Sequence, residues 1–401
     1  MNCKSQKKKS QITITNFFSI IFLILILAIT FINLFSVLNQ NLEDTELRLS
    51  KENIDYCEKT FNEKFIGQQK WIRIYGGFQF LQQKNEINNF EIIKDSDDFL
   101  HKPVPIKSDE NLNSYAENLE KIYNYSKSKK IPFLYVQAPS DFIPDKTQVE
   151  IGMDYISFPN NNIDRFLNLI KSKNIPFIDV RCYLDNMSLD DIFYKTDHHW
   201  AMPIVFRTFQ ETISILNSEY ELNIDSECYY RSQDNYEVIS YPNSFLGSYG
   251  ILTGDIYTEK DHIQIYQPIF NTHFIHKYYE KDIEKWSKKG EFHQVFIDDE
   301  ILQNTNYLNK YNAYMFNSAC ESHVINIMNE NNLRCLIISD SFSRPLVPYY
   351  SLCFSELAWI DPQQGRYDKN CKEFIDNFQP DCIIVLFNGN SPYIEIPWSE
   401  N

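Results

Sequence analysis

The sequence lacks the excess of basic residues that binding to a nucleic acid requires. Its 401 residues include 38 Lys and Arg against 54 Asp and Glu, which gives a net charge of −16 at neutral pH. Because affinity for nucleic acids rests on Lys and Arg neutralising phosphates, this balance argues against nucleic acid as a partner. Charged residues at 23% and hydrophobic residues at 43% predict a folded globular protein, not a disordered chain.

The sequence also lacks any Cys-x-x-Cys pair, although it contains nine cysteines. Scattered cysteines without that spacing argue against a structural zinc site. The number is odd, so one or two disulfides and a set of buried thiols both fit the sequence. We expect the protein to hold no metal and no cofactor.

Charged side chains are absent from residues 17–35, within an apolar run over residues 12–38. This run is long enough to span a bilayer as a helix, and no small-x-small cleavage site follows it. The pattern favours an uncleaved signal anchor over a cleaved secretory signal. Lysines before the run, at positions 4 and 7–9, predict a cytoplasmic N-terminus. Residues 1–39 are therefore predicted to be a cytoplasmic tail and a single transmembrane helix in the cell membrane, with the C-terminal domain extracytoplasmic.

The remaining sequence divides into two predicted regions. Apolar and aromatic positions at intervals of three to four predict that residues 40–105 are a stalk and a helical layer. Residues 106–395 alternate helical stripes with short apolar runs, which predicts an α/β domain with a parallel sheet flanked by helices. The runs predicted as strands are residues 132–138, 176–180, 333–338 and 381–387. A β-rich or irregular insertion is predicted at about residues 221–330.

The most distinctive segment of the sequence contains an acid two residues before a histidine. Asp197 and His199 have the spacing of an orienting acid and a catalytic base. In an extended segment residues i and i+2 lie on the same side, so Asp197 and His199 converge while His198 points away as a packing or hydrogen-bonding residue. We expect Trp200 to pack beside the histidine and not to stack on a sugar.

Ser341 is the predicted nucleophile. It follows a buried strand and precedes a segment expected to be helical, where free backbone N–H groups favour developing negative charge. In open α/β sheets, ligands gather outside the carboxyl ends of the strands, so residues 339–343 and 388–390 are expected to form walls of one site. Ser341 as nucleophile, His199 as base and then acid, and Asp197 as orienting acid make a triad, in which chain order is no obstacle.

A metal site at Asp197, His198 and His199 is the alternative interpretation of the same segment. Adjacent residues rarely converge on one ion without further ligands. Other histidines, such as His273 and His276, lie in the predicted insertion. We therefore favour the triad over metal-assisted hydrolysis.

Residues 196–200, with the letters TDHHW, together with residues 339–342 resemble the DHHW family. This family contains relatives of the AlgX and AlgJ alginate O-acetylation proteins, which have an SGNH-hydrolase-like domain. Residues 245–250 and the last strand match as well, and the similarity runs over most of residues 60–390. The resemblance implies an SGNH-hydrolase-like fold with an N-terminal membrane anchor or an export signal.

The resemblance also implies a function. It is that of an O-acetyltransferase or acetylesterase that moves an acetyl group onto or off a cell-surface polysaccharide. Asp197, His199 and Ser341 match the catalytic positions of the family. Such relatives receive the acyl group from a membrane-bound O-acyltransferase partner, which the resemblance implies here too.

Two questions stay open at the level of sequence. The second donor to an oxyanion has three candidates, Gly247, Asn317 and Asn388. The usual SGNH enzymes carry the serine early and the histidine late, whereas the order is reversed here, as in the alginate branch.

The alternative function is a catalytically silent polysaccharide-binding or assembly protein of the cell envelope, suggested by 26 Tyr, 30 Phe and the large insertion.

Overall fold

The computed structural model describes residues 17, 19–28, 30–32, 65, 67–318, 320–390 and 396–399. The chain divides into two compact units, Met1–Tyr75 and Gly76–Asn401. In the first unit, the described residues between 17 and 32 are helical and exposed. No helix within the described residues is long and apolar enough to cross a membrane. The predicted transmembrane helix is therefore not supported, and parts of its apolar run lie outside the described residues.

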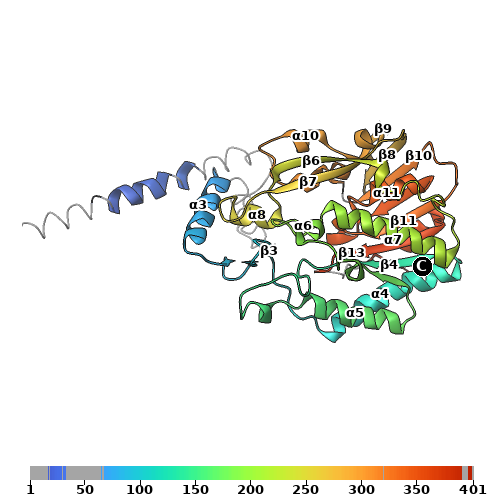
Figure 1. Cartoon of the computed structure of the whole chain (residues 1–401), viewed down its shortest axis with the longest axis horizontal. Coiled ribbons are helices and arrows are strands. Elements are labelled where there is room, and N and C mark those ends of the chain that lie inside the picture. Colours follow the sequence, from blue (N-terminus) through green and yellow to red (C-terminus); the bar gives the residue numbers. More distant parts are fainter. Residues whose placement is uncertain are drawn as a thin grey trace, which may run out of the picture. The chain divides into compact units, whose positions relative to one another are not determined.

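The second unit is built on an eight-stranded sheet, which Figure 1 shows between layers of helices. In sheet order, the strands are β5 (Phe177–Asp179), β4 (Phe133–Gln137), β13 (Cys382–Phe387), β11 (Arg334–Ser339), β12 (Glu356–Ile360), β10 (Glu321–Asn326), β8 (Phe274–Glu280) and β9 (Ile283–Gly290). The first five of these strands are parallel to one another, and the last three continue the sheet with antiparallel pairing. The mixed α/β class with a largely parallel sheet is confirmed.

The insertion predicted at residues 221–330 extends this sheet. β8 and β9 form a hairpin whose two turn residues, Lys281 and Asp282, have φ values of 48° and 65°. Two positive φ values are typical of the tight turns that match the twist of antiparallel strands. β10 then joins the hairpin to β12. The sheet is therefore not parallel throughout, because the insertion supplies its antiparallel edge.

Helices cover both faces of the sheet. One face carries α4 (Asp109–Ser128), α5 (Pro159–Ser172) and α12 (Cys371–Phe378). The opposite face carries α7 (Met202–Tyr220) and α11 (Val347–Cys353). Figure 1 shows α4 and α5 together, and α7 apart from them, across the strands of the sheet. This arrangement is the one that alternating helices and strands predict.

The strands at the centre of the sheet are buried on both faces. In β11, Cys335 and Ile337 pack with the α7 layer, whereas Leu336 and Ile338 pack with the α4 and α5 layer. Successive side chains of a strand point to opposite faces, so a continuous apolar run fills both layers. The sequence predicts all four of its expected strands correctly, and β12 is an additional strand that it does not predict.

The remaining elements are not part of the eight-stranded sheet. The two-stranded β6 and β7 and the three-stranded β1 to β3 form separate small sheets. The short elements are α3 (Gln68–Leu81), β1 (Glu86–Ile87), β2 (Ile92–Lys94), β3 (Leu100–His101), η1 (Asp154–Ile156), η2 (Val180–Tyr183), α6 (Leu189–Ile192), η3 (Gln233–Asn235), β6 (Tyr236–Phe245), α8 (Ser248–Thr253), β7 (Asp261–Pro268), α9 (Phe292–Phe296), α10 (Asp299–Gln303), η4 (Lys310–Ala313), η5 (Met315–Asn317), η6 (Ser341–Ser343) and η7 (Gln363–Gly365).

The cysteines of the described residues are free thiols. They are Cys182, Cys228, Cys320, Cys335, Cys353, Cys371 and Cys382. Five of the seven are buried. Of the two alternatives that the sequence leaves open, the described part of the chain shows thiols and not disulfides.

Candidate active site

The Asp-His-His-Trp segment forms the turn between α6 and α7. The backbone N–H of His199 donates to Asp197 Oδ1 at 2.9 Å, which closes a turn through the Asp side chain. A β-bridge between Phe193 and Trp200 joins the two ends of the segment. Asp197 and His199 converge as predicted, but they do so because the backbone turns and not because it is extended.

Asp197, His199 and Ser341 form one hydrogen-bonded chain. His199 Nδ1 lies 2.5 Å from Asp197 Oδ1, and His199 Nε2 lies 2.9 Å from Ser341 Oγ. Asp197 is fully buried and His199 is 6% exposed, whereas Ser341 is partly exposed. Both distances are within the reach that proton transfer requires. The structure therefore brings together the three residues that the sequence singles out, although they are up to 144 positions apart.

Burial and neighbouring charges set the protonation states of this chain. Burial alone would raise the pKa of Asp197, but the imidazoles of His199 and His198 and the N–H of Ser248 hold that pKa well below its usual value. Burial, together with repulsion from His198, lowers the pKa of His199 to about 3, against the attraction of Asp197. At neutral pH Asp197 is ionised and His199 is neutral, which are the states that a general base and its orienting acid need.

Residues 247 and 248 support Asp197 from the other side. The N–H of Ser248 donates to Asp197 Oδ2 at 2.5 Å, and the N–H of Gly247 donates to Thr196 Oγ1 at 2.8 Å. A Cβ on Gly247 would lie 2.3 Å from Asp197 Cβ, so only glycine allows this close approach. Gly247 therefore supports the acid, and its N–H is already occupied, which removes it from the candidates for the oxyanion donor.

Gly247→Ala should displace Asp197 and weaken both folding and activity. The new methyl group overlaps a buried side chain, for which we expect a loss of about 1–3 kcal/mol in the free energy of unfolding. Thermal unfolding and ester cleavage of the same samples would measure both effects. Gly77→Ala is the control, because its methyl group would meet only the Ile256 side chain, at 3.3 Å. Equal activity of the Gly247 and Gly77 variants would contradict this role of Gly247.

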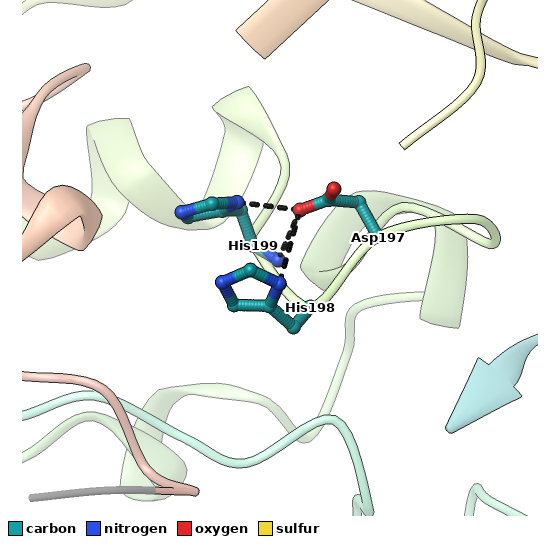
Figure 2. Close-up of side chains that lie close together, drawn as sticks. All are labelled: Asp197, His198 and His199. Carbon is teal, nitrogen blue, oxygen red and sulfur yellow. Dashed lines mark hydrogen bonds and ion pairs between the residues drawn. The ribbon is translucent and has the colours of Figure 1, made fainter. Parts of the chain in front are cut away.

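His198 does not point away from the site. Its ring centroid lies 4.0 Å from that of His199, and its Nδ1 lies 2.9 Å from Ser248 Oγ. Figure 2 shows both imidazoles beside the Asp197 carboxylate. The predicted hydrogen-bonding role is confirmed, but the predicted direction is wrong because the turn brings both rings to one carboxylate. The side chain of His198 is 33% exposed, whereas those of Asp197 and His199 are buried.

The ligand atoms of the alternative metal site are engaged in hydrogen bonds within the structure. One ligand atom each from Asp197, His198 and His199 lies within 4.8 Å of the others. However, both carboxylate oxygens of Asp197 accept N–H groups, and both ring nitrogens of His199 are engaged by Asp197 and Ser341. The donor atoms are thus arranged as an acid–base pair, and we retain the expectation of no metal.

Trp200 attaches the histidine segment to the nucleophile turn. Its side chain is fully buried, and its Nε1 donates to the backbone oxygen of Phe342 at 2.9 Å. The two rings also pack, with centroids 5.4 Å apart. The predicted packing role of Trp200 is confirmed, and this contact fixes the distance between His199 and the serine that follows β11.

Ser341 begins the short helix η6, directly after β11. Asp340 caps this helix, because its Oδ1 accepts the N–H of Phe342 at 3.0 Å. Its Oδ2 accepts the N–H of Asn388 at 3.0 Å and Asn388 Nδ2 at 2.5 Å. Burial raises the pKa of Asp340, against these hydrogen bonds. The loops after β11 and β13 therefore meet, as predicted for neighbouring parallel strands.

Tyr311 is a residue of the site that the sequence does not reveal. Its ring stacks on His199 with centroids 3.7 Å apart and an angle of 17° between the planes. Its hydroxyl donates to the backbone oxygen of Ser341 at 3.0 Å. It therefore contacts both the base and the nucleophile turn. Nothing in its sequence context separates it from the other 25 tyrosines, because it reaches the site from the insertion.

Comparison with known proteins supports the fold of this site. No protein-family model and no curated protein matches the chain. Among solved structures, Bacillus cereus PatB1 with a sulfonyl adduct aligns with a TM-score of 0.61 and 16% identity, over 78% of this chain and 97% of PatB1. A DHHW family protein from Eubacterium siraeum aligns with a TM-score of 0.57 and 14% identity, over 75% of this chain and 91% of that protein. At such identities the likeness shows the fold alone. The resemblance to the DHHW family thus extends from the motif to the fold.

Proposed function

We propose that the protein is an extracytoplasmic serine acyltransfer enzyme, either an O-acetyltransferase or an acetylesterase, that acts on a cell-surface polysaccharide. The observation that carries this proposal is the hydrogen-bonded chain from Asp197 through His199 to Ser341. The fold shared with PatB1, which is solved with a sulfonyl adduct, supports it. The class of substrate is taken from the resemblance to the DHHW family.

The first half of the proposed reaction loads the acyl group onto Ser341. His199 Nε2 takes the hydroxyl proton while Ser341 Oγ attacks the acyl carbon of an ester, and the carbonyl electron pair moves onto its oxygen. When the C=O bond forms again, the bond to the leaving alkoxide breaks. The alkoxide then takes the proton from His199. The imidazolium that exists between these two transfers is stabilised by ionised Asp197.

The second half of the reaction transfers the acyl group. A sugar hydroxyl gives its proton to His199 Nε2 and attacks the acyl carbon. The bond to Ser341 Oγ breaks in the collapse, and the serine oxygen takes the proton back. With water in place of the sugar the same steps give hydrolysis, so transfer requires an acceptor that competes with water.

The outcome of the two halves can be measured with one donor. The full chain is incubated with p-nitrophenyl acetate, alone and with a mixture of cellulose, chitin and alginate oligomers. Acetyl esters on the oligomers, detected by mass spectrometry, indicate a transferase, and acetate alone indicates an esterase. If nitrophenol is released no faster than in buffer in either case, the proposed function is wrong.

The activity should persist at acidic pH. The reaction needs neutral His199, and since burial lowers its pKa to about 3, the neutral form remains as the pH falls through the ordinary histidine value of 6.5. Activity is lost only when the pH falls through the lowered pKa. We expect kcat/KM for ester cleavage to stay level from about pH 8 to about pH 5. An acid limb centred near 6.5 would contradict this prediction.

His198→Gln provides the matched check on this pH dependence. Repulsion from His198 is among the causes that lower the pKa of His199, so its removal should shift the acid limb to higher pH. His262→Gln is the control, because that side chain is exposed in β7. The control should leave the acid limb in place.

The alternative of a silent binding protein loses its main motivation in the structure. It was suggested by the aromatic content, but many of these rings fill the core. The largest fully buried side chains include Trp359, Tyr135, Tyr257, Tyr349, Tyr350, Tyr367, Phe133, Phe166, Phe209 and Phe245. Packing explains the burial of these aromatic residues without a glycan.

The membrane context remains part of the proposal. We propose that the apolar run over residues 12–38 anchors the chain and that a membrane-bound O-acyltransferase supplies the acyl group. The support for the anchor is the sequence of the run, and the support for the partner is the family resemblance. Separation of membranes from the soluble fraction of cells that express the full chain would test the anchor.

A further inference from the structure

A buried histidine outside the triad lies between two buried carboxylates. His101 Nε2 lies 3.1 Å from Asp95 Oδ2, and His101 Nδ1 lies 3.7 Å from Asp141 Oδ2, the first within hydrogen-bond range and the second within ion-pair range. An ionised carboxylate only accepts protons in hydrogen bonds, so an imidazole that faces one with each ring nitrogen is stable there with a proton on both. The geometry therefore favours a buried imidazolium at His101.

The neighbours of His101 keep it charged at neutral pH. Burial would lower its pKa, but Asp141 and Asp95 together raise that pKa to about 9. These two are the charged groups that face the ring, Asp141 from the segment after β4 and Asp95 from the turn between β2 and β3. Asp95 is fixed by that turn, because its Oδ1 accepts the N–H groups of Asp97 and Phe99 at 3.0 and 2.8 Å.

Asp141 is also bound to the loop that follows β13. Asn390 Nδ2 donates to Asp141 Oδ1 at 2.8 Å. Two residues earlier in the same loop, Asn388 donates to Asp340 through its backbone N–H and through Nδ2. Asp340 in turn caps the short helix that begins with Ser341. One short loop therefore links Asp141 to the nucleophile turn.

Tyr249 links Asp141 to the acid half of the triad. The buried side chain of Tyr249 is hydrogen-bonded to Asp141. The residue before it, Ser248, donates its backbone N–H to Asp197 Oδ2. The backbone N–H of Tyr249 donates to the oxygen of Thr196 at 3.0 Å. The start of α8 is thus held by Asp141 at one end and holds Asp197 at the other.

The strand that carries His101 contacts the motif segment directly. The N–H of Leu100 donates to the backbone oxygen of Lys195 at 2.8 Å, and Lys195 Nζ donates to the backbone oxygen of Asp97 at 3.3 Å. Asp197 follows two residues later. The imidazolium is therefore anchored on the same backbone unit as the acid of the triad.

We propose that Asp141, held by its ion pair with His101, is a positioning residue that joins the acid half and the nucleophile half of the triad. Through Tyr249 it fixes the start of α8, whose first N–H binds Asp197. Through the loop after β13 it fixes the turn that begins with Ser341. This inference rests on the proposed acyltransfer function, because it concerns the geometry of the same triad.

The test measures the rate constant at which p-nitrophenyl acetate acetylates the full chain. This rate constant reports on the geometry of the folded molecules, whereas the amplitude of acetylation counts them. Asp141→Asn keeps the size of the side chain and removes its charge. We expect it to lower the rate constant by about 10-fold to 100-fold, because a shift of about 1 Å between reacting groups has effects of this size.

Tyr249→Phe removes only the hydroxyl that binds Asp141, and it provides the same test if Asp141→Asn does not fold. We expect a loss of about 10-fold in the rate constant. The double variant should lose no more than Asp141→Asn alone, because both residues act through one contact and such effects are not additive. Additive losses would contradict the proposed link.

Asp225→Asn is the matched control for the loss of a buried ion pair. Asp225 Oδ2 lies 3.2 Å from Arg231 Nε, and its carboxylate accepts the backbone N–H groups of Tyr230 and Arg231. This change should lower the amplitude of acetylation and leave the rate constant in place. A loss of rate constant as large as that in Asp141→Asn would overturn the inference.

His101 adds a readout at alkaline pH that a merely structural role would not move. Since the carboxylates raise its pKa to about 9, the ion pair is present below that pH and is lost as the pH rises through it. We expect the acylation rate constant, after subtraction of the Ser341→Ala background, to fall over the same range. His101→Gln should be slower at neutral pH and should lack this alkaline limb.

His276→Gln is the matched control for the removal of a buried histidine. His276 is fully buried, but its Nδ1 contacts the backbone oxygen of Val295 and its ring packs on Trp286. The variant should keep the alkaline limb of the wild-type chain. An alkaline limb that is unchanged in His101→Gln would overturn the role of the ion pair.

Failure of this inference can be distinguished from failure of the proposed function. If the wild-type chain is acetylated at Ser341 and the Asp141, Tyr249 and His101 variants react with the same rate constant, Asp141 does not position the triad although the acyltransfer function stands. If the wild-type chain forms no acyl adduct at Ser341, the proposed function fails and the inference fails with it.

Discussion

Ser341→Ala should lose acyl transfer and ester cleavage by about 10⁴-fold or more in kcat, with the fold intact. Ser341 Oγ lies 2.9 Å from His199 Nε2 and is the atom proposed to take the acyl group, and alanine offers no oxygen at that position. The change removes one atom from a partly exposed residue, so stability should change little. Nitrophenol release from p-nitrophenyl acetate, followed together with thermal unfolding, measures both quantities.

Ser343→Ala is the matched control for this loss. Ser343 lies in the same short helix and is fully buried, and its hydroxyl bonds to Ser339 and to the backbone oxygen of Asp340. Its removal should lower stability, because buried polar groups lose a partner, while the activity per folded molecule is retained. If Ser341→Ala keeps more than a small fraction of the wild-type rate, another residue must act as the nucleophile.

Asp197→Asn should lower kcat by about 10⁴-fold, the effect of the same change in a serine protease triad. Asp197 accepts the backbone N–H of His199 and its Nδ1 through one oxygen and the N–H of Ser248 through the other. An asparagine has only one oxygen for these donors, so its NH2 group would face a donor or the ring. A ring that accepts at Nδ1 carries its proton on Nε2, where it cannot receive the proton of Ser341.

Asp261→Asn is the control for the loss of a buried carboxylate near the motif. Asp261 accepts the backbone N–H groups of Lys195 and Thr196 and the hydroxyl of Thr196, but it does not contact His199. The Asp261→Asn substitution should lower the free energy of unfolding, and the pH dependence of the remaining activity should not change. A measurement of kcat across the pH range for both variants decides this, since equal losses would show that Asp197 acts only through folding.

The sequence predicts the parts of the fold that depend on local patterns. Apolar runs such as those of β11 and β13 are buried on both faces and therefore have a clear signature. Pro203 marks the start of α7, because proline is tolerated in the first turn of a helix. The meeting of residues 340 and 388 also follows from the rule that ligand sites gather at the carboxyl ends of parallel strands.

Features that depend on contacts between distant segments are not visible in the sequence. β8, β9 and β10 alternate as an insertion should, but nothing local shows that they extend the central sheet. The direction of His198 follows from a turn closed by the Asp197 side chain, where the sequence pattern favoured an extended segment. Tyr311 reaches the site through packing and has no motif of its own.

The most direct test of the central claim is the mass of the protein during the reaction. The full wild-type chain is mixed with p-nitrophenyl acetate, quenched in acid and digested, and the peptides are sequenced by mass spectrometry. We predict one acetyl group on the peptide that contains Ser341, absent from Ser341→Ala and discharged when an acceptor sugar or water is given time to react. An acetyl group that stays on another residue, or turnover of the ester with no adduct at Ser341, would contradict the claim that the acyl group passes through this serine.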